Sequence, residues 1–414
     1  MGYLLVAACA SLAVWLWLTL GQGMFWRTDT RLPPRHDPAR WPSVAIVVPA
    51  RDEAEVLPHS LPSLLAQDYP GEAEVILVDD GSTDGTAALA RRLADAQCGL
   101  PLTVLSPGEP GAGWTGKLWA LRHGIAHARS GARSGAHPSP DPGPDFGPES
   151  PQGSAQGPAP EYLLLTDADI AHASDSLREL VAAATTADLD LVSQMARLRA
   201  VSVWERLIVP AFVYFFAQLY PFRWINRPAT RTAAAAGGCV LLRTEAAVRA
   251  GIPESIRQAV IDDVSLARAV QRAGGRIWLG LAERVDSVRP YASLADLWRM
   301  VSRSAYAQLR HRPALLAGTV AGLVLVYLVP PAALLAGLAG GRPDVAWAGG
   351  LAWLLMAGTY LPMLRYYHQP VVLAPLLPLT TLLYLLMTVD SAVQHYRGRG
   401  AAWKGRTYAR PGDA

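Results

Sequence analysis

Long apolar runs occupy the two ends of the chain, and a mixed apolar and polar pattern lies between them. Residues Tyr3 to Leu20 carry no charge, and the apolar stretch extends to Trp26, which is long enough to cross a bilayer core as a helix. A signal peptide would instead need a basic first segment and a small-residue cleavage site, and neither is clear. Basic residues after a first span favour a cytoplasmic position for the domain that follows. Such residues stand here at Arg27, Arg31, Arg35 and Arg40. We therefore expect residues 1–26 to be a retained membrane anchor.

The segment from Trp41 to about Arg289 has the pattern of a soluble α/β domain. Short apolar runs that end at polar loops predict buried parallel strands. These runs are Val44–Val48, Glu74–Val78 and Tyr162–Leu165. Helical patterns such as Thr86–Ala96 lie between them, and this alternation predicts a doubly wound, mostly parallel sheet that binds ligands at the carboxyl ends of its strands.

Residues 129–160 interrupt this pattern. The segment is crowded with Pro, Gly and Ser and contains one aromatic residue, Phe146. It therefore cannot bury enough apolar surface to offset the loss of chain entropy. We expect a disordered surface insertion, with a partner-binding linker as the alternative.

Further apolar segments lie in the second half of the chain. Val203 to Trp224 is interrupted by Glu205, Arg206, Pro210 and Pro221, which suits an interfacial helix or a buried groove better than a full span. Three later stretches predict spanning helices within a membrane region of residues 313–394. They are about Pro313–Ala339, Val345–Leu364 and Val371–Val389.

The sequence leaves open on which side of the membrane the chain ends. A cytoplasmic domain followed by three crossings places residues 395–414 outside. This tail is basic, however, and the positive-inside rule favours the cytoplasm for it. A re-entrant stretch at Pro330–Pro331 would reconcile the two.

Composition narrows the function classes. The chain is 51% hydrophobic and 17% charged, which is apolar for a wholly soluble enzyme. Its net charge of +3 is too small for a nucleic-acid footprint, and no basic stripe is visible. Cys9, Cys98 and Cys239 show neither paired nor metal-ligand spacing, so we expect free thiols in a reducing compartment.

Polar clusters follow the first two predicted strands. Pro49-Ala50-Arg51-Asp52-Glu53 comes directly after the first strand, and Asp79-Asp80 ends the second. Charged loops after strands are common, but these can present backbone and side-chain groups to a nucleoside. Helix capping accounts for Thr83 or Asp84. It does not account for two acids at the end of a strand.

A third cluster, Asp167-Ala168-Asp169, follows the third strand. Two aspartates at i and i+2 can place oxygen ligands around one hard divalent cation. Mg²⁺ or Mn²⁺, with diphosphate oxygens and water in the remaining positions, fits this pattern. Such an ion neutralises charge that builds on a departing nucleoside diphosphate. Short motifs also arise by chance, and the place of this one at a strand end supports the metal site.

Three further groups complete the candidate site. Asp262-Asp263 precedes a helical pattern, in which Asp262 can be the N-cap and Asp263 a general base in the first turn. Gly237-Gly238-Cys239 offers side-chain-free backbone to an acceptor, or else forms a tight packing turn. Lys117 opens a helix after a Gly-rich loop, a position that suits a diphosphate, although a solvated surface lysine fits the sequence as well.

In this order the clusters resemble glycosyltransferase family 2 with its GT-A fold, over about Trp41 to Arg310. The resemblance is closer still to the bacterial hopene-associated glycosyltransferases, and three stretches carry it. These are Gly113-Trp114-Thr115-Gly116-Lys117-Leu118-Trp119-Ala120-Leu121, Tyr220-Pro221-Phe222-Arg223-Trp224 and Thr232-Ala233-Ala234-Ala235-Ala236-Gly237-Gly238-Cys239. The terminal membrane segments agree with that family as well.

The resemblance implies a hexosyltransferase of the bacterial inner membrane, which moves one sugar with inversion from a nucleotide sugar, usually a UDP-sugar, to an acceptor that is a lipid. By motif position, residues 49–53 with Asp79 and Asp80 would hold the nucleoside. Asp167 and Asp169 would contact the metal and the diphosphate, and Asp263 would be the general base. Processive members carry Gln-x-x-Arg-Trp before their channel helices. The comparable region here reads Arg299-Met300-Val301-Ser302-Arg303-Ser304, which favours single-sugar transfer over polysaccharide synthesis.

Two other functions stay open on the sequence. A polyprenyl-phosphate sugar transferase would use a phosphate acceptor, which is already ionised and needs no base. A catalytically inactive membrane scaffold is the alternative from a different class, but binding alone does not require both a metal pair and a base.

Overall fold

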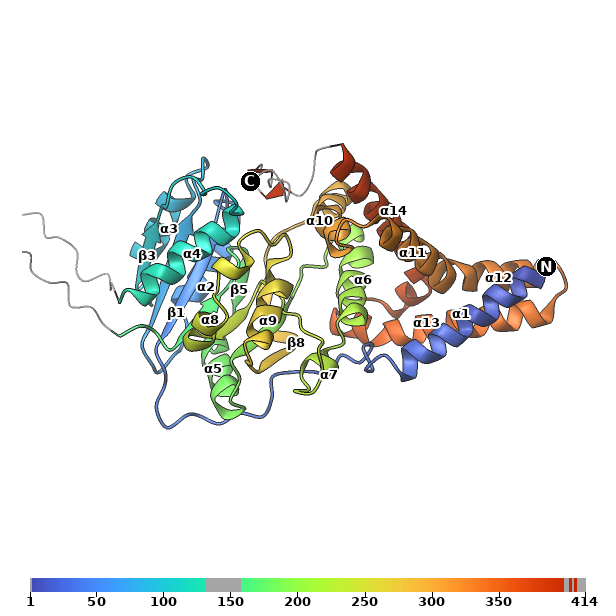
Figure 1. The fold of residues 1–414 in the computed structure, drawn as a ribbon, viewed down its shortest axis with the longest axis horizontal. Coiled ribbons are helices and arrows are strands. Elements are labelled where there is room, and N and C mark those ends of the chain that lie inside the picture. Colours follow the sequence, from blue (N-terminus) through green and yellow to red (C-terminus); the bar gives the residue numbers. More distant parts are fainter. Residues whose placement is uncertain (1, 132–157, 398–401, 404–405, 408–414) are drawn as a thin grey trace, which may run out of the picture.

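The computed structural model describes residues 2–131, 158–397, 402–403 and 406–407. Residues 132–157 of the expected insertion and most of the expected basic tail lie outside these ranges. Figure 1 shows an α/β domain at one end of the molecule and a helical region at the other, with α6 (Val203–Leu219) and α10 (Leu294–Gln308) between them. The two apolar ends of the chain thus lie together, away from the sheet.

Eight strands form one sheet in the order β3-β2-β1-β4-β7-β6-β8-β5. They are β1 (Val44–Ala50), β2 (Ala73–Asp79), β3 (Leu102–Leu105), β4 (Tyr162–Leu165), β5 (Ile170–His172), β6 (Leu191–Arg197), β7 (Val240–Arg243) and β8 (Ile277–Ser287). Strand β1 pairs in parallel with β2 and β4, β2 with β3, and β6 with β8, whereas β7 and β5 run antiparallel to their neighbours. The expected mostly parallel sheet is confirmed. A separate ladder joins β9 (Ala402–Trp403) and β10 (Arg406–Thr407).

Helices cover both faces of the sheet, so the central strand β1 is buried along its whole length. Its alternating side chains divide between two cores: Val47 belongs to one and Ile46 to the other. The covering helices are α2 (Leu57–Leu65), α3 (Thr86–Asp95), α4 (Gly116–Arg129), α5 (Ser176–Thr186), α8 (Thr244–Arg249) and α9 (Asp262–Arg272), with the short 3-10 helix η1 (Glu254–Ile256) before α9. A Cβ at Gly124 of α4 would lie 2.4 Å from Val47 Cγ1. Glycine therefore lets α4 lie directly against β1, which fixes its first turn beside the strand end.

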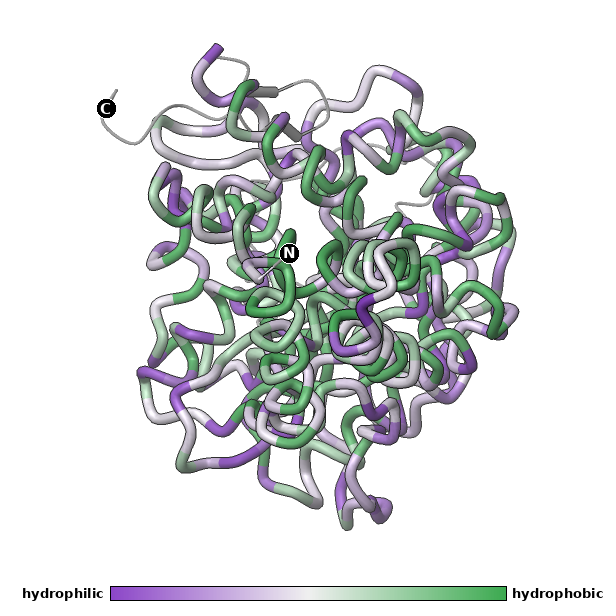
Figure 2. The backbone as a smooth tube through the Cα atoms, turned by 90° about the vertical axis from the view of Figure 1, so that its right-hand side faces the viewer, coloured by the Kyte–Doolittle hydropathy of each residue, from purple (hydrophilic) through white to green (hydrophobic). Residues whose placement is uncertain are grey.

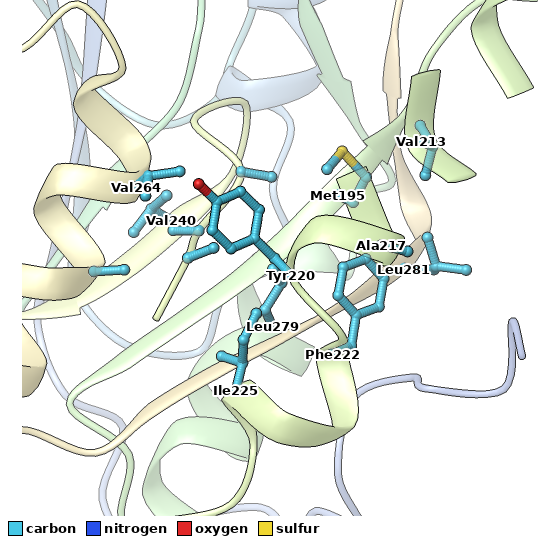
Figure 3. Packing of buried hydrophobic residues seen from close by; sticks show 14 of the residues in the cluster. Met195, Val213, Ala217, Tyr220, Phe222, Ile225, Val240, Val264, Leu279 and Leu281 are labelled. Atoms are coloured by element: carbon cyan, nitrogen blue, oxygen red, sulfur yellow. The ribbon is translucent and has the colours of Figure 1, made fainter. Parts of the chain in front are cut away.

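Helix α6 leads from the sheet toward the helical region. Ser202 and Glu205 close its first turn as a capping box. The middle of the helix is buried, while its apolar ends at Val203 and Leu219 are exposed. The short helix α7 (Phe222–Ile225) follows. Figure 3 shows the turn between the two helices packed into the core, with labelled residues Met195, Val213, Ala217, Tyr220, Phe222, Leu279 and Leu281. The segment expected to be interfacial or buried is thus mostly buried, with exposed apolar residues at the two ends of α6.

Four segments of the described chain are long and apolar enough to cross a membrane. The first is α1 (Gly2–Leu20) and the third is α13 (Pro343–Tyr366). The second, Pro313–Ala339, consists of α11 (Pro313–Leu323), the π-helix η2 (Val324–Leu328) and α12 (Val329–Ala339). The fourth, Val371–Tyr396, consists of η3 (Val371–Leu376) and α14 (Leu377–Tyr396). Figure 2 faces the helical end of the molecule and shows that the coils around the N-terminus are mostly hydrophobic. One apolar helix at the N-terminus and three in the C-terminal part were expected, and this is confirmed.

A tryptophan from α1 compensates for the double proline in the second apolar segment. In a regular helix the carbonyl of Val326 would accept from residue 330, or in a π-helix from residue 331, but both are prolines without an N–H. Trp15 Nε1 donates to that carbonyl at 2.7 Å, and Ser11 Oγ contacts it at 3.4 Å. Because a free carbonyl is costly in an apolar layer, this contact lets the helix run on to Ala339. The double proline does not turn the chain back.

The last apolar segment, Val371–Tyr396, begins and ends on the side of the α/β domain. Just before it, Gln369 Nε2 donates to the carbonyl of Ala200 at 3.0 Å. At its end, the hydroxyl of Tyr396 lies 2.9 Å from that of Tyr306 in α10. Figure 1 shows α14 running back toward α10. This segment therefore returns to the domain rather than leading away from it.

The Trp15 contact predicts a selective stability loss. Replacing Trp15 with Phe keeps an aromatic ring but leaves the Val326 carbonyl without its main donor, so we expect the unfolding free energy to fall by about 1–3 kcal/mol. Trp17→Phe is the control, since Trp17 is 56% exposed and Trp15 is fully buried. Thermal unfolding of both purified variants in the same detergent measures the difference. Equal midpoints for Trp15→Phe and the unmodified protein would contradict the capping role.

Candidate active site

Three strand ends converge because β1 pairs in parallel with β2 on one side and β4 on the other. Ala50 lies opposite Asp79, and the amide of Asp80 donates to the carbonyl of Ala50 at 2.9 Å. The amide of Thr166 likewise donates to the carbonyl of Val47 at 3.2 Å. The clusters after β1, β2 and β4 therefore meet at one edge of the sheet, as the sequence predicts.

The loop after β1 is tied to the end of β2. Arg51 Nη1 donates to the backbone carbonyl of Asp80 and lies 3.5 Å from its carboxylate, which is fully buried. Asp79 Oδ1 accepts from the amide of Ser82 at 3.0 Å and from its hydroxyl. Asp84 closes the next turn by accepting from Thr86. Both Asp79 and Asp84 therefore stabilise the loop after β2 by accepting hydrogen bonds from residues two or three positions later.

Lys117, in the first turn of α4, stands between two carboxylates. Its Nζ lies 2.8 Å from Asp167 Oδ1 and 3.1 Å from Asp262 Oδ2, and its side chain is 19% exposed. Burial disfavours the ammonium form, but the charges of Asp167 and Asp262 outweigh this and raise the pKa of Lys117 above its ordinary value. The residue is thus a charged member of the site and not a solvated surface lysine.

Helix α9 begins differently from the expectation. Asp262 was expected to be the N-cap, and this is wrong: the cap position is Ile261, which makes no side-chain cap bond, and Asp262 is the first helical residue. Its carboxylate turns to Lys117 instead, because an ammonium nearby offers a stronger partner than the helix N–H groups.

Asp263 is held at the start of α9 by two backbone groups. Oδ2 accepts from the amide of Gly237 at 3.1 Å, and Oδ1 from the amide of Val264 at 2.7 Å. Burial, followed by the charge of Asp262, raises the pKa of Asp263 to about 6, although Lys117 and the two amides oppose the shift. A carboxylate with a pKa in that range can exchange a proton near neutral pH.

The Gly-rich stretch contributes unequally to this cluster. A Cβ at Gly237 would lie 3.4 Å from Lys117 Nζ and 3.5 Å from Asp263 Cβ, so glycine keeps this space open. The carbonyl of Gly238 accepts from Thr166 Oγ1 at 2.8 Å. Cys239 is fully buried, and burial raises the pKa of its thiol to about 12. Of the three, Gly237 faces the acids and Cys239 belongs to the core.

Asp169 has a cationic partner that the sequence analysis missed. Arg289, just after β8, donates through Nε to Asp169 Oδ2 and through Nη2 to Glu53 Oε2, both at 2.6 Å. Burial opposes its charged form, but the two carboxylates outweigh this and raise the pKa of Arg289. The available signal was its position two residues after an apolar strand, which is the same signal that identified the other clusters.

One cavity brings most of these groups together. Its polar lining residues are Lys117, Thr166, Asp167, Asp262 and Asp263, with Gly237 and Pro49 beside them. Apolar side chains line the cavity as well, among them Leu118, Leu121 and Ile125 of α4. The cavity therefore joins the segments after β1 and β4, the Gly-rich stretch and the starts of α4 and α9.

The site carries an excess of negative charge. Its carboxylates are Glu53, Asp167, Asp169, Asp262 and Asp263, and its cations are Lys117 and Arg289. Five acids against two cations leave three negative charges when all are ionised. Such an edge repels a bare diphosphate.

Within the described residues, no three His, Cys, Asp or Glu side chains group in a way that could hold a metal ion. The expected site needs two, Asp167 and Asp169, and each of them is paired with a protein cation, Lys117 and Arg289. Their hard oxygen ligands and the excess negative charge fit Mg²⁺ or Mn²⁺.

Residues 42–307, more than half of the chain, match the family described as "Glycosyltransferase like family 2". The chain belongs to glycosyltransferase family 2. It is 37% identical over 87 residues to a 4,4'-diaponeurosporenoate glycosyltransferase of Staphylococcus aureus, and this match spans 21% of either chain. Only about a fifth of the length of that curated relative is therefore matched.

A solved structure extends the comparison across the family-2 chain. A mannosyltransferase of Pyrobaculum calidifontis, PcManGT, in complex with GDP-Man and Mn²⁺, superposes with a TM-score of 0.53 at 20% identity, covering 94% of this chain and 99% of the other. At that identity the likeness concerns the fold. The expected GT-A fold is confirmed.

Proposed function

We propose that the protein transfers a single sugar from a nucleotide-sugar donor to a lipid acceptor at the membrane. The observation that carries this proposal is the cluster of Lys117, Asp167, Asp262 and Asp263 around one cavity. It places a cation suited to a diphosphate next to a carboxylate suited to proton transfer. Membership of glycosyltransferase family 2 supports the reaction class.

On this proposal the donor lies along the edge of the sheet. Residues 49–53 with Asp79 and Asp80 hold the nucleoside, which is a UDP unit by resemblance. The ammonium of Lys117, within 3.1 Å of two carboxylates, reaches the diphosphate at the first turn of α4. Asp167 and Asp169 hold a divalent cation, which neutralises charge on the departing diphosphate when bound. The Mn²⁺ in the complex of the similar mannosyltransferase supports a metal of this type.

Asp263 acts as the general base in an inverting transfer. An acceptor hydroxyl must lose its proton as it attacks the anomeric carbon, and a carboxylate held by Gly237 and Val264 is fixed to receive it. Gly237 carries no side chain between the acceptor and this carboxylate. The bond from oxygen to the anomeric carbon forms as the bond to the diphosphate breaks.

The acceptor is a lipid on this proposal, and three observations support it. The chain has four apolar segments that fit a membrane. The motifs resemble those of hopene-associated glycosyltransferases. The partly matching Staphylococcus aureus relative is, by its name, a glycosyltransferase of 4,4'-diaponeurosporenoate.

We further propose that the α/β domain and the basic tail lie on the same, cytoplasmic face of a bacterial inner membrane. Two contacts support this, one at each end of Val371–Tyr396: Gln369 with Ala200, and Tyr396 with Tyr306. If this segment re-enters the bilayer from the domain side, three crossings remain. The basic tail and the positive-inside rule then agree.

The reaction class is tested by nucleotide release. Purified protein incubated with UDP-sugars and a membrane lipid extract should release UDP when Mn²⁺ is present. Release should stop when EDTA is added. Asp169→Asn should abolish release with the fold intact, while Asp175→Asn, which alters an exposed acid paired with Arg284, should not. Full activity in EDTA would contradict the metal, and the absence of release with any donor would contradict the function.

The base is tested by two neighbouring variants. Asp263→Asn should lower kcat by about 10²–10⁴-fold with donor affinity nearly unchanged, because only proton transfer is lost. Asp262→Asn should lose far less, since its amide oxygen still accepts from Lys117. Both are measured on the same acceptor and donor. Full activity of Asp263→Asn would indicate a phosphate acceptor, as in a polyprenyl-phosphate sugar transferase.

The membrane arrangement is tested by labelling. In a Cys9→Ser, Cys98→Ser background, Gly340→Cys lies at the turn between α12 and α13 and should react with a membrane-impermeant maleimide added outside intact cells. A cysteine appended after residue 414 should react only after the cells are opened. Labelling of the appended cysteine from outside would show that Val371–Tyr396 crosses the membrane.

A further inference from the structure

Arg289 joins two carboxylates that follow neighbouring strands of the sheet, Glu53 after β1 and Asp169 after β4. Its guanidinium donates to Asp169 and Glu53, each at 2.6 Å. The three side chains are 26%, 16% and 8% exposed, respectively. These are charge-assisted, poorly solvated contacts, and the guanidinium occupies the Oδ2 atom of Asp169.

The backbone on both sides of Arg289 is fixed. The amide of Val288 donates to the carbonyl of Asp169 at 2.9 Å. Two residues beyond Arg289, the amide of Tyr291 donates to Glu205 Oε1 at 2.8 Å. Any change in the partners of Arg289 must therefore come from rotation of its side chain.

The contact with Asp169 conflicts with metal binding at the same carboxylate. A divalent ion on Asp169 would stand within a few ångströms of the guanidinium, and two cations at that distance repel each other in a poorly solvated site. A donor diphosphate offers the guanidinium an alternative partner with matching geometry. The contact of Nη2 with Glu53 can persist while Nε leaves Asp169.

We propose that Arg289 is an exchangeable counter-ion: it neutralises Asp169 while the site is empty, and moves to the donor diphosphate when metal and donor bind. This proposal rests on the proposed function and assigns a positioning residue within it. Its consequence is thermodynamic. Because Arg289 competes with the metal until the diphosphate draws it away, metal and nucleotide should each strengthen the binding of the other by the same factor.

The test measures metal binding without any sugar or acceptor. Full-length protein in detergent is titrated with Mn²⁺, and free Mn²⁺ is followed by electron paramagnetic resonance, with and without UDP. In the unmodified protein, UDP should tighten Mn²⁺ binding. Arg289→Gln should bind Mn²⁺ alone about tenfold more tightly, the change produced by removing about 1.4 kcal/mol of repulsion, and should lose most of the enhancement by UDP.

Two further variants make the result specific. Arg284→Gln removes a nearby arginine whose partner is the exposed Asp175, at 2.6 Å, and should leave Mn²⁺ binding unchanged. Arg289→Lys keeps the charge at the site and should restore most of the competition. Arg289→Met, which also removes the charge, takes the place of Arg289→Gln if that variant does not fold, with the same expected result.

Three results would overturn the proposal. Unchanged or weaker Mn²⁺ binding in a folded variant without the charge would make Arg289 a fixed structural residue. Equal enhancement by UDP in variant and unmodified protein would remove the coupling. Absence of Mn²⁺ binding in the unmodified protein would remove the exchange itself. By contrast, normal exchange without sugar transfer would overturn the proposed function alone.

Discussion

Repulsion among carboxylates is the constraint on which the rest of the site depends. The parallel pairing of β1 with β2 and β4 brings acidic loops from distant parts of the chain to one edge. Lys117 and Arg289 reduce the repulsion among these carboxylates in the free protein, because each forms ion pairs with two of the acids. The elements that hold these two cations are correspondingly rigid: α4 lies directly against β1 through Gly124, and Arg289 is bracketed by backbone hydrogen bonds.

The parts of this arrangement that are local in sequence were predictable. Apolar runs identified β1, β2 and β4, and the acids that follow each run lie where parallel strands must end together. Asp263 and Gly237 could be named as candidates, but their contact depends on the docking of α9. Asp262 shows the limit: its position before a helix suggested capping, whereas Lys117, 145 positions earlier, decides its direction.

Arg289 follows an apolar strand and could have been named as a candidate, but its partners could not be inferred because they are 120 and 236 residues away. Arg289 follows strand β8, which pairs in parallel with β6 and antiparallel with β5. The alternation of apolar and polar residues does not predict which strands pair in this way. The membrane segments show the same division. Hydropathy alone predicts these segments. The return of Val371–Tyr396 to the domain depends instead on long-range contacts, such as those of Gln369 with Ala200 and of Tyr396 with Tyr306.

The bond from Trp15 to Val326 links residues 311 positions apart, and this has a consequence for biosynthesis. The ribosome delivers α1 first, long before the π-helix that it caps exists. Throughout synthesis of the α/β domain, the Trp15 indole N–H and the Ser11 hydroxyl of α1 lack their final acceptor. The N-terminal helix is therefore more than a tether: it is a stored component of the helical region, and assembly of that region can finish only when the last third of the chain emerges.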